Sequence, residues 1–535
     1  MSSQNPNPPA RVLIADNLSE NGVELLRGSP DIEVTVKIGM TPDELGVTIG
    51  DYDALVVRSA TKVTAEVLER PGRLRAIGRA GTGVDNIDLE AATRAGVVVM
   101  NTPGGNSVAA AELTLAHLIA LARHLVQANH ELRRGRWERK KYVGSEIEGK
   151  TIGIVGLGRI GREVARRAKG LRMEVVGYDP YVSTDASAGF GVRGVTLDEL
   201  LAQADFVTLH LPLSDNTRHL IDASKLAKMK RGARLINCAR GGLVDEDALF
   251  DALESGQLAG AALDVFEAEP PADRRLVDHP LVVATPHLGA STREAQERVG
   301  SEIAEKIRDY LRSGTILDAV NFPSFDRETS LLLRPYMDLA VRLGGFVSQI
   351  VDGGHRRLVV RTYGTIGELS LRPLVLAAVK GLLGKAVEGG VSYINALLLA
   401  KERGITVEEA RSNEASAYAG LLRVRLETDT GHAEVGGTLL TADRPRLVEI
   451  DGLPIESTLD GHMLFIRNRD VPGVVGKIGT ILGRDGVNIA GIHLGRTDGT
   501  NGAVSIVDVD SRPSESAITE IGSFDEITLV RAVAV

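Results

Sequence analysis

A glycine-rich stretch in the middle of the chain constrains the fold more than any other feature. Gly156, Gly158 and Gly161 follow an apolar run and open a predicted helix, and a second apolar run then ends at Asp179. This order, in which a strand, a glycine turn, a helix and a second strand lead to an acidic residue, is that of a dinucleotide-binding βαβ unit. Such a unit usually begins its domain, yet 150 residues precede this one. The fold must therefore account for a long segment before the unit.

The three glycines and the acidic residue together predict the cofactor. The glycines permit a tight turn, close approach of the backbone to a pyrophosphate and close packing of helix on strand. Asp179 lies 18 residues after Gly161, near the spacing of about 20 that is typical of this fingerprint. Its carboxylate would accept hydrogen bonds from the adenosine ribose and repel a 2′-phosphate, so we expect NAD rather than NADP. The alternative, a glycine turn beside an incidental surface aspartate, requires all these features to coincide.

Apolar runs on both sides of this stretch indicate two parallel α/β sheets. Five runs alternate with helix-like segments between residues 11 and 101: "RVLIAD", "IEVTV", "ALVVR", "LRAIGRAG" and "VVVM". Six more follow, the strand count of a full doubly wound nucleotide domain: "TIGIVG", "EVVGYD", "DFVTLHL", "ARLINC", "AGAALDV" and "LVVATP". Between the two sets, Asn106 or Ser107 can cap a long helix that continues to about residue 124. An amphipathic helix is expected over about 292–311, ended by "AVNFPS".

Beyond residue 323 the alternation of apolar runs and helix-like segments becomes less regular. From 324 to about 460 the sequence predicts two helices, "LRPYMDLAVRLGGFVSQI" and "LRPLVLAAVKGLLG", and then the strands "LLRVRLET", "EVGGTLL" and "RLVEIDG", with no catalytic constellation. From His462 to Val535 the order strand, turn, helix, strand, hairpin, helix and strand predicts a βαββαβ unit, with two helices on an antiparallel sheet.

Charge and cysteine content narrow the partners and the compartment. The net charge of -9 argues against a nucleic-acid surface or an anionic membrane as the main partner, and we expect no metal site. The single cysteine, Cys238, rules out an internal disulfide and fits a reducing compartment. The first ten residues are polar and proline-rich, so they predict a frayed tail rather than a signal peptide. We expect a cytoplasmic protein.

Three predicted strands are followed by polar residues of different types: Arg240, Glu269 and His287. Open α/β sheets bind ligands at the carboxyl ends of their strands, so these residues should meet in one crevice. Hydride transfer from a secondary alcohol needs a base, a carboxylate that orients the base and raises its pKa, and a cation that holds the substrate. Each residue taken alone is more often structural or solvated, but beside an NAD fingerprint the set favours a dehydrogenase.

Five motifs resemble the D-isomer-specific 2-hydroxyacid dehydrogenases: "GRAGTGVDNIDLEAA", "GLGRIG", "NCARGGLVDEDAL", "ALDVFEAEPP" and "PHLGASTREAQ". The resemblance covers about residues 11–322 and implies that Arg240, Glu269 and His287 are catalytic. It also implies cofactor contacts at Gly156, Gly158, Arg159, Ile160, Gly161, Asp179, Pro212, Cys238, Arg240, Asp264, His287 and Gly289.

The resemblance explains the 150 residues before the glycine stretch. In this family a doubly wound Rossmann domain is inserted into a flavodoxin-like substrate domain. We therefore expect a substrate-binding lid at 11–102 and 292–322 and the NAD domain at 103–291. The two crossings would form a hinge.

The loops of the lid suggest a substrate with more than one negative charge. Arg58 and Arg79 follow predicted strands, with Lys62 close by, and arginine matches phosphate oxygens bidentately. The residues alone leave solvated arginines equally open. The resemblance favours phosphate, because the member with a phosphorylated substrate uses matching arginines, and it adds Ser59, Gly81 and Asn106 as substrate contacts.

The last segment is similar to an ACT domain, an amino-acid-sensing module, and 323–460 is similar to the intervening domain of long-form members. The ACT resemblance, over 461–535, implies that Asp470 and Asn488 bind the ammonium and carboxylate of a small amino acid across an ACT pair. Asn468 stands where some relatives carry histidine or an aromatic residue. A dimerisation unit without a ligand is the alternative, and a homotetramer is the family's habit.

The resemblance therefore implies NAD-dependent oxidation of 3-phospho-D-glycerate to 3-phosphooxypyruvate, the first step of L-serine biosynthesis, restrained by serine. One alternative is oxidation of an unphosphorylated D-2-hydroxy acid. Another is a non-catalytic NAD-sensing protein like the corepressor relatives.

Overall fold

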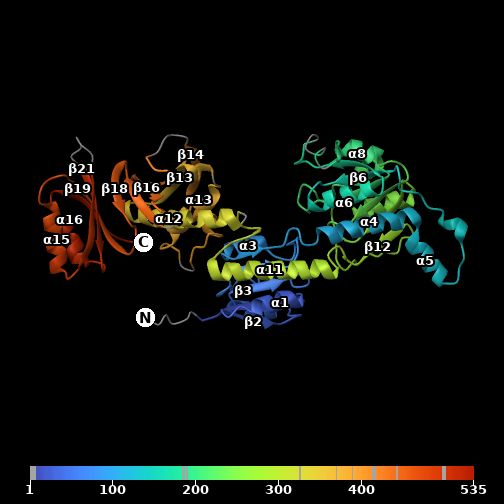
Figure 1. Cartoon of the computed structure of the whole chain (residues 1–535), viewed down its shortest axis with the longest axis horizontal. Coiled ribbons are helices and arrows are strands. Elements are labelled where there is room, and N and C mark those ends of the chain that lie inside the picture. The colour runs from blue at the N-terminus through green and yellow to red at the C-terminus, as the bar shows by residue number, and fades with distance from the viewer. Residues whose placement is uncertain are drawn as a thin grey trace.

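The chain forms an elongated row of domains in the computed structural model, with α5 at one end and α15 and α16 at the other (Figure 1). The structure describes residues 8–535 except 184–186, 188, 190, 324–326, 369, 388–389, 413–416, 442–443 and 497–501. Most of the predicted N-terminal tail lies outside the described residues.

The first sheet is parallel and has five strands in the order β2-β1-β3-β4-β5, which is the flavodoxin-like order. The strands β3, β4 and β5 are almost wholly buried apolar runs, as expected for a sheet covered on both faces, whereas the edge strand β2 buries only Ile32. The elements are β1 (Ala10–Ile14), α1 (Glu20–Arg27), β2 (Ile32–Val36), α2 (Pro42–Thr48), η1 (Ile49–Asp51), β3 (Ala54–Val57), β4 (Ala76–Arg79), α3 (Leu89–Arg94) and β5 (Val98–Met100).

The second sheet carries all six predicted strands and adds a two-residue edge strand, in the order β12-β11-β10-β9-β6-β7-β8. The described pairings are parallel. The elements are β6 (Thr151–Val155), α6 (Arg159–Gly170), β7 (Glu174–Tyr178), β8 (Arg193–Gly194), α8 (Leu197–Gln203), β9 (Phe206–Leu209), α9 (Ala223–Lys228), β10 (Ala233–Asn237), α10 (Glu246–Glu254), β11 (Leu258–Leu263) and β12 (Val282–Ala284). The doubly wound fold is confirmed.

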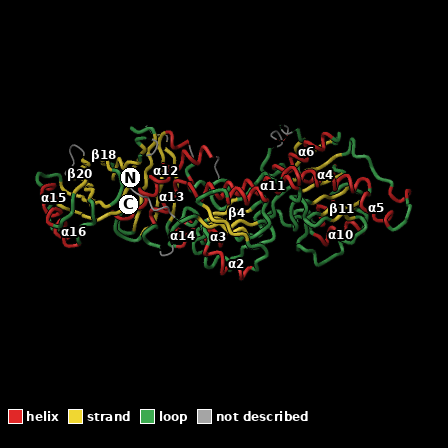
Figure 2. The backbone as a smooth tube through the Cα atoms, turned by 60° about the horizontal axis from the view of Figure 1, so that its bottom comes forward, coloured by secondary structure: helices red, strands yellow, loops and turns green. Residues whose placement is uncertain are grey.

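Two long helices connect the sheets. α4 (Ser107–Arg123) leads into the second sheet and is followed by α5 (Leu125–Arg133) and η2 (Arg139–Tyr142). α11 (Arg293–Ser313) follows the second sheet but packs Ile303 and Ile307 into the core of the first. The two sheets accordingly form separate blocks on either side of α11 (Figure 2).

The ends of these helices differ from the sequence predictions. Asn106 takes the N-cap position of α4, but its Oδ1 accepts a hydrogen bond from Thr82 Oγ1 at 2.7 Å instead of capping the helix. α11 extends to Ser313, where Gly314 adopts a left-handed conformation with φ 70°, which stops a helix readily. "AVNFPS" lies beyond that end, so the glycine rather than this segment terminates the helix.

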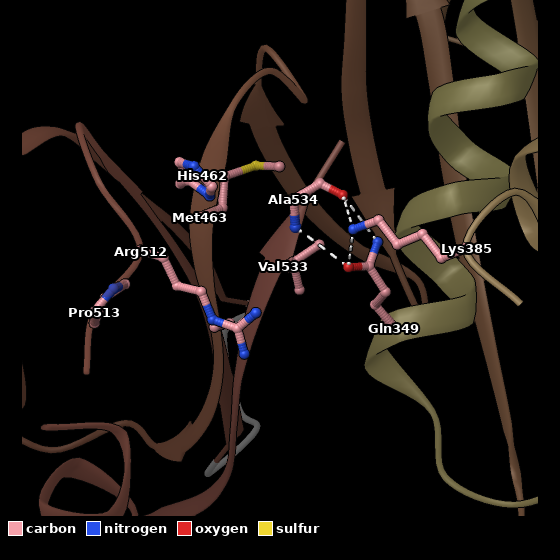
Figure 3. Close-up of a pocket in the computed structure, with 9 residues that line it drawn as sticks. Gln349, Lys385, His462, Met463, Arg512, Pro513, Val533 and Ala534 are labelled. Carbon is pink, nitrogen blue, oxygen red and sulfur yellow. Dashed lines mark hydrogen bonds between the residues drawn. The ribbon is translucent and has the colours of Figure 1, made fainter. Parts of the chain in front are cut away.

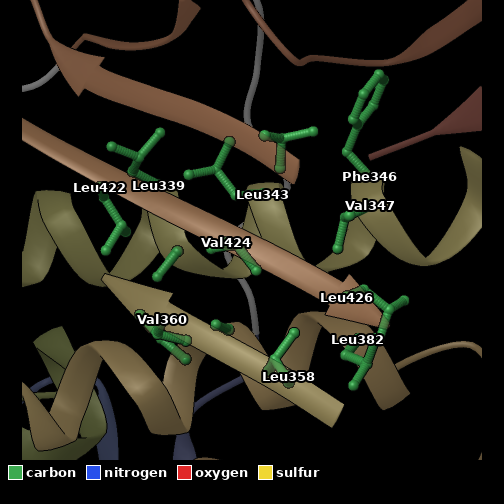
Figure 4. Packing of buried hydrophobic residues seen from close by; sticks show 14 of the residues in the cluster. Leu339, Leu343, Phe346, Val347, Leu358, Val360, Leu382, Leu422, Val424 and Leu426 are labelled. Carbon is green, nitrogen blue, oxygen red and sulfur yellow. The ribbon is translucent and has the colours of Figure 1, made fainter. Parts of the chain in front are cut away.

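The third sheet has six strands in the order β14-β13-β15-β16-β17-β18. It packs on α12 and α13 through a core that includes Leu343, Phe346, Leu358 and Val424 (Figure 4). The elements are α12 (Arg327–Ile350), β13 (His355–Gly364), η3 (Thr365–Glu368), α13 (Arg372–Leu383), α14 (Ala396–Glu402), β14 (Thr406–Ser412), β15 (Gly420–Thr428), β16 (His432–Leu439), β17 (Pro445–Ile450) and β18 (Leu453–Ser457). The sequence patterns did not predict β13, β14, β18 or α14. In β13 and β14, several charged residues obscure the strand period.

The fourth sheet is antiparallel in the order β20-β21-β19-β22, the predicted βαββαβ unit. Its elements are β19 (His462–Arg469), α15 (Val474–Arg484), β20 (Ile489–Arg496), β21 (Gly502–Val509), α16 (Glu515–Gly522) and β22 (Ile527–Ala534). The sheet face away from the helices packs on α12, where the rings of Phe346 and Phe465 meet edge to face at 5.9 Å. Lys385 and Gln349 also bind the Ala534 carbonyl at this junction (Figure 3).

Among the described residues, no single helix is long and apolar enough to cross a membrane. α4 and α5 satisfy that length and composition only as a pair, which bends by 65°, and most of α4 is buried inside the protein.

Candidate active site and effector site

Each position of the glycine fingerprint favours glycine for a different physical reason. Gly156 has φ 100°, and a Cβ there would lie 2.5 Å from the His210 carbonyl oxygen. A Cβ at Gly161 would lie 2.0 Å from the Gly156 carbonyl oxygen, so the glycine allows α6 to pack closely on the turn. A Cβ at Gly158 would meet no described atom within 4 Å. The open side of Gly158 at the start of α6 is where a dinucleotide pyrophosphate can approach the backbone, so the loop fits NAD.

The other predicted cofactor positions follow strands of the same sheet or begin α6. Asp179 follows β7, and its carboxylate accepts hydrogen bonds from the backbone N–H groups of Leu157 and Tyr181 at 2.8 and 2.9 Å. These bonds hold the carboxylate at the glycine turn. Arg159 and Ile160 begin α6, and Pro212 follows β9.

The predicted catalytic residues follow three neighbouring strands. Arg240 follows β10, Glu269 follows β11 and His287 follows β12, and these strands are adjacent in the sheet. His287 Nδ1 lies 2.7 Å from Glu269 Oε2. Burial acts to raise the pKa of Glu269, but the hydrogen bond and charge of His287, the Phe266 N–H and the charge of Arg240 leave that pKa below its ordinary value. Glu269 is therefore ionised when it accepts the Nδ1–H of His287.

Asp264 holds the loop that carries His287. Its fully buried carboxylate accepts hydrogen bonds from Thr285 Oγ1 at 2.6 Å and from the N–H groups of Leu288 and Gly289 at 2.7 and 2.8 Å. His287 itself has φ 53°, an uncommon value for a non-glycine residue that the surrounding bonds maintain. The structure thus places Asp264 behind the crevice, as a support for the loop.

Cys238 and His117 form a second buried support. Cys238 Sγ lies 3.3 Å from His117 Nδ1, and His117 Nε2 lies 3.2 Å from Thr285 Oγ1. Burial raises the pKa of the Cys238 thiol to about 12, with a further contribution from Asp264. The thiol therefore stays protonated, and its side chain packs against α4.

The predicted substrate arginines lie at the carboxyl edge of the first sheet. Arg79 ends β4, and burial together with the positive charges of Arg240 and Arg58 lowers its pKa to about 10. Its buried Nε has no hydrogen-bond partner among the described residues. Gly81 provides the space, because a Cβ there would lie 1.6 Å from Arg79 Nη1. Three guanidinium groups are therefore close enough for their positive charges to interact.

The loop that carries Arg58 and Ser59 is held from both sides. Asp16, buried at the end of β1, accepts hydrogen bonds from the N–H groups of Arg58 and Thr61 at 2.6 and 3.1 Å. Asn86 Nδ2 donates to the carbonyl oxygens of the same two residues, each at 2.7 Å. Sequence reasoning missed both supports, although Asn86 belongs to the quoted "GVDNID" motif.

The predicted effector residues do not meet within one chain. Asp470 follows β19 at the edge of the sheet where β21 begins, and Arg496 Nη1 lies 3.8 Å from its Oδ2. Asn488 precedes β20 at the opposite edge, where β21 ends, and donates to Asp510 at 2.8 Å. Asn468 is buried in β19 and donates to the Arg469 carbonyl.

Three family models match the chain in order. The NAD-binding domain of the D-isomer specific 2-hydroxyacid dehydrogenases matches residues 115–289, the D-3-phosphoglycerate dehydrogenase intervening domain 332–451, and the ACT domain 462–526. A D-3-phosphoglycerate dehydrogenase from Synechocystis is 43 % identical over 96 % of this chain and 92 % of that protein. The human D-3-phosphoglycerate dehydrogenase is 46 % identical over 77 % of each chain. This chain belongs to the D-3-phosphoglycerate dehydrogenase family.

Solved structures cover a smaller part of the chain. The TT0316 protein from Thermus thermophilus is 37 % identical, with a TM-score of 0.54, and the match covers 58 % of this chain and 99 % of that one. A glyoxylate reductase from Paecilomyes thermophila is 33 % identical, with a TM-score of 0.53, and the match covers 58 % of this chain and 98 % of that one. The relative from Synechocystis, by contrast, matches nearly the full length.

One cross-domain contact was not predicted from the sequence. Arg240 Nε donates to Asp85 Oδ2 at 2.8 Å, which joins the second sheet to a loop of the first. Asp85 lies in "GVDNID", and only the folded chain brings it to Arg240.

Proposed function

We propose that this chain oxidises 3-phospho-D-glycerate to 3-phosphooxypyruvate with NAD, in L-serine biosynthesis. The observation that carries the proposal is the proximity of positive charges to the His287–Glu269 pair: Arg58 and Arg240 lower the pKa of Arg79, and the charge of Arg240 also lowers the pKa of Glu269. A substrate with a carboxylate at one end and a phosphate at the other brings three negative charges to that cluster at neutral pH. An unphosphorylated acid would bring only one negative charge and would leave Arg79, which has no ion-pair partner among the described residues, without a direct counter-charge. A mostly buried cation without such a partner is costly.

The geometry supports a role in this reaction for each residue of the site. Because ionised Glu269 accepts the Nδ1–H of His287, the Nε2 atom of the neutral ring can take the proton of the substrate hydroxyl. Arg240 binds the substrate carboxylate and the developing carbonyl. When bound, NAD would supply the hydride acceptor for the carbon that carries this hydroxyl. The open backbone at Gly158 and the carboxylate of Asp179 would hold the pyrophosphate and the ribose.

A comparison of acids tests this function. The purified chain is assayed with NAD and 3-phospho-D-glycerate, D-glycerate or D-lactate, and we expect kcat/KM to be highest for the phosphorylated acid by at least about tenfold. Higher kcat/KM for D-glycerate would favour the unphosphorylated alternative. Turnover of none of the acids would favour an NAD-sensing protein.

Serine is the effector we propose, at a site shared by two chains. β20 has one hydrogen-bonded neighbour in the described sheet, so its other edge can pair with a second copy. Antiparallel pairing of two β20 strands would bring Asn488 of one chain to Asp470 and Arg496 of the other. The half-exposed apolar residues Ile492, Leu494, Val471 and Val475 lie on the same unit, 38–54 % exposed, and a second copy would cover them.

Exposed apolar residues at the other end of the molecule support a second contact between copies, and hence a homotetramer. α5 and the segment after it expose Leu125, Val126, Leu132, Trp137 and Val143, with Trp137 76 % and Val143 77 % exposed. Basic residues surround them in "RRGRWERKK", while the whole chain has a net charge of -9, so another copy offers complementary charge. Two different two-fold contacts on one chain generate a closed tetramer.

Sedimentation and titration test the assembly and the effector. We expect a tetramer for the parent and a dimer for Trp137→Ala, while Val47→Ala, a change at an exposed apolar residue of α2, leaves the tetramer intact. Titration calorimetry should give serine binding to the parent that Leu494→Arg abolishes. Serine binding by a Leu494→Arg chain that no longer pairs through β20 would contradict the shared site.

Cys238 is the single cysteine and is buried with a protonated thiol. We propose the cytoplasm as the compartment of this chain, because nothing in such a thiol requires an oxidising environment.

A further inference from the structure

The ion pair between Asp85 and Arg240 joins the two parallel-sheet blocks of the chain. Asp85 belongs to the loop after β4, and Arg240 follows β10, 155 residues later in the chain. The Nε–Oδ2 distance of 2.8 Å is that of a charge-assisted hydrogen bond. The contact therefore joins the part of the molecule that bears Arg58 and Arg79 to the part that bears His287.

The bonds of Arg240 leave one edge of its guanidinium for a ligand. Nε donates to Asp85, and Nη1 donates to the Ala239 carbonyl at 2.6 Å. A guanidinium has five N–H groups, so one on Nη1 and two on Nη2 remain without a described acceptor. Of these three, one N–H of Nη1 and one of Nη2 form the terminal edge, which can bind a carboxylate bidentately, while the second N–H of Nη2 lies on the Nε edge beside Asp85.

Gly83, in the same loop as Asp85, limits the position of the guanidinium at Nη2. A Cβ at Gly83 would lie 1.8 Å from Arg240 Nη2, so the guanidinium lies directly against the backbone of the loop. The loop thus provides an acceptor for Nε at Asp85 and a space for Nη2 at Gly83. Together the two residues define the plane and the direction of the guanidinium.

The exposure of the pair points to orientation rather than stability. The Asp85 side chain is 66 % exposed and the Arg240 side chain 28 % exposed. Exposed ion pairs contribute little to the free energy of folding. Orientation of a catalytic group is different, because a displacement of about 1 Å can lower a rate by about 10²-fold.

We propose that Asp85 is a positioning residue for the dehydrogenation, a role that rests on the proposed function. Its carboxylate holds the Nε edge of Arg240 so that the Nη edge faces the substrate. Because the two residues belong to different sheets, Arg240 has its working orientation only when the loop after β4 lies against the crevice. Asp85 thereby makes closure of the cleft a condition for catalysis.

The test compares substitutions at Asp85 and Gly83, the two loop residues that adjoin the Arg240 guanidinium. Asp85→Ala should lower kcat/KM for 3-phospho-D-glycerate by about 10²-fold. Asp85→Glu should recover a part of the loss, because it keeps a carboxylate. Gly83→Ala should lower kcat/KM with Asp85 intact. Glu90→Gln, which changes an exposed acid on α3 of the same sheet, is the matched control and should match the parent. NAD affinity from fluorescence titration and the melting temperature should be unchanged in all of them.

A double-mutant cycle separates positioning from a general loss of structure. If Asp85 acts through Arg240, Asp85→Ala should have little further effect on kcat/KM in an Arg240→Lys background. A full additional loss in that background would overturn the proposal, and so would parent-like kcat/KM for Asp85→Ala alone. A parent without turnover of any acid contradicts the proposed function itself. An active parent with an unaffected Asp85→Ala chain contradicts only this inference.

Discussion

The second parallel sheet and the fourth, antiparallel sheet differ in whether the residues at their strand ends lie at one edge of the sheet. In the parallel sheet, β10, β11 and β12 run in the same direction, so the residues after them, Arg240, Glu269 and His287, share one edge. In the antiparallel sheet, Asp470 and Asn488 each adjoin a strand end but lie at opposite edges. A parallel sheet can assemble a site from one chain, whereas the effector site proposed for this antiparallel unit would need a second copy. The predictions below test that difference.

The largest expected effect is the loss of the base at the parallel-sheet site. His287→Asn should lower kcat by roughly 10²- to 10⁴-fold while NAD affinity stays near that of the parent, because the change removes the proton acceptor and leaves the glycine turn intact. Single-turnover kinetics and NAD titration measure the two effects. A kcat within a few-fold of the parent would remove His287 from the mechanism.

The next largest effect concerns the arginines proposed to bind the substrate phosphate, and it is measured by comparing a phosphorylated with an unphosphorylated acid. Arg79→Gln should lower kcat/KM for 3-phospho-D-glycerate by a factor that corresponds to a loss of about 1.5 to 3 kcal/mol of transition-state stabilisation. The loss for D-glycerate should be much smaller. Arg58→Gln should show the same preference. Arg27→Gln, in the last turn of α1 at the opposite edge of the sheet, is the control. Equal losses for both acids would mean that these arginines do not bind the phosphate.

Mixed tetramers test directly whether the effector site lies between chains. Asp470→Ala and Asn488→Ala chains should each lose serine inhibition, since every site in a homogeneous pair lacks one group. When the two variants are denatured together and refolded, a mixed pair contains one intact site, so part of the inhibition should return. Couplings between sites are typically about 1 to 3 kcal/mol, which a serine titration of kcat resolves. No recovery on mixing would place both groups in a site within one chain, or outside the site.

The smallest effect concerns cofactor choice. Asp179→Ala should raise kcat/KM with NADP relative to NAD by about tenfold or less, because the change removes the repulsion of a 2′-phosphate without adding a positive partner for it. Steady-state assays with both cofactors give the ratio. An unchanged ratio would show that the carboxylate does not contact the ribose.

The sequence predicted the strands of both parallel sheets except the two-residue β8, since buried parallel strands are continuous apolar runs. It was less successful between residues 355 and 412, where charged residues in β13 and β14 obscure the period. The candidate site shows the same division. The glycine turn and the residues after β10, β11 and β12 follow from local pattern. The supports by Asp16, Asn86 and His117 do not, because each joins residues far apart in the chain.

The sequence by itself determined the nucleotide turn, the chemical types at the strand ends and the order of the four units. These depend on backbone requirements and on periods of neighbouring residues, which are readable along the chain. Only the tertiary structure decided that Asp85 reaches Arg240 and that Asp470 and Asn488 lie apart. Those relations depend on how packed sheets face one another and on strand direction within a sheet, and neither is set by residues that are close in sequence.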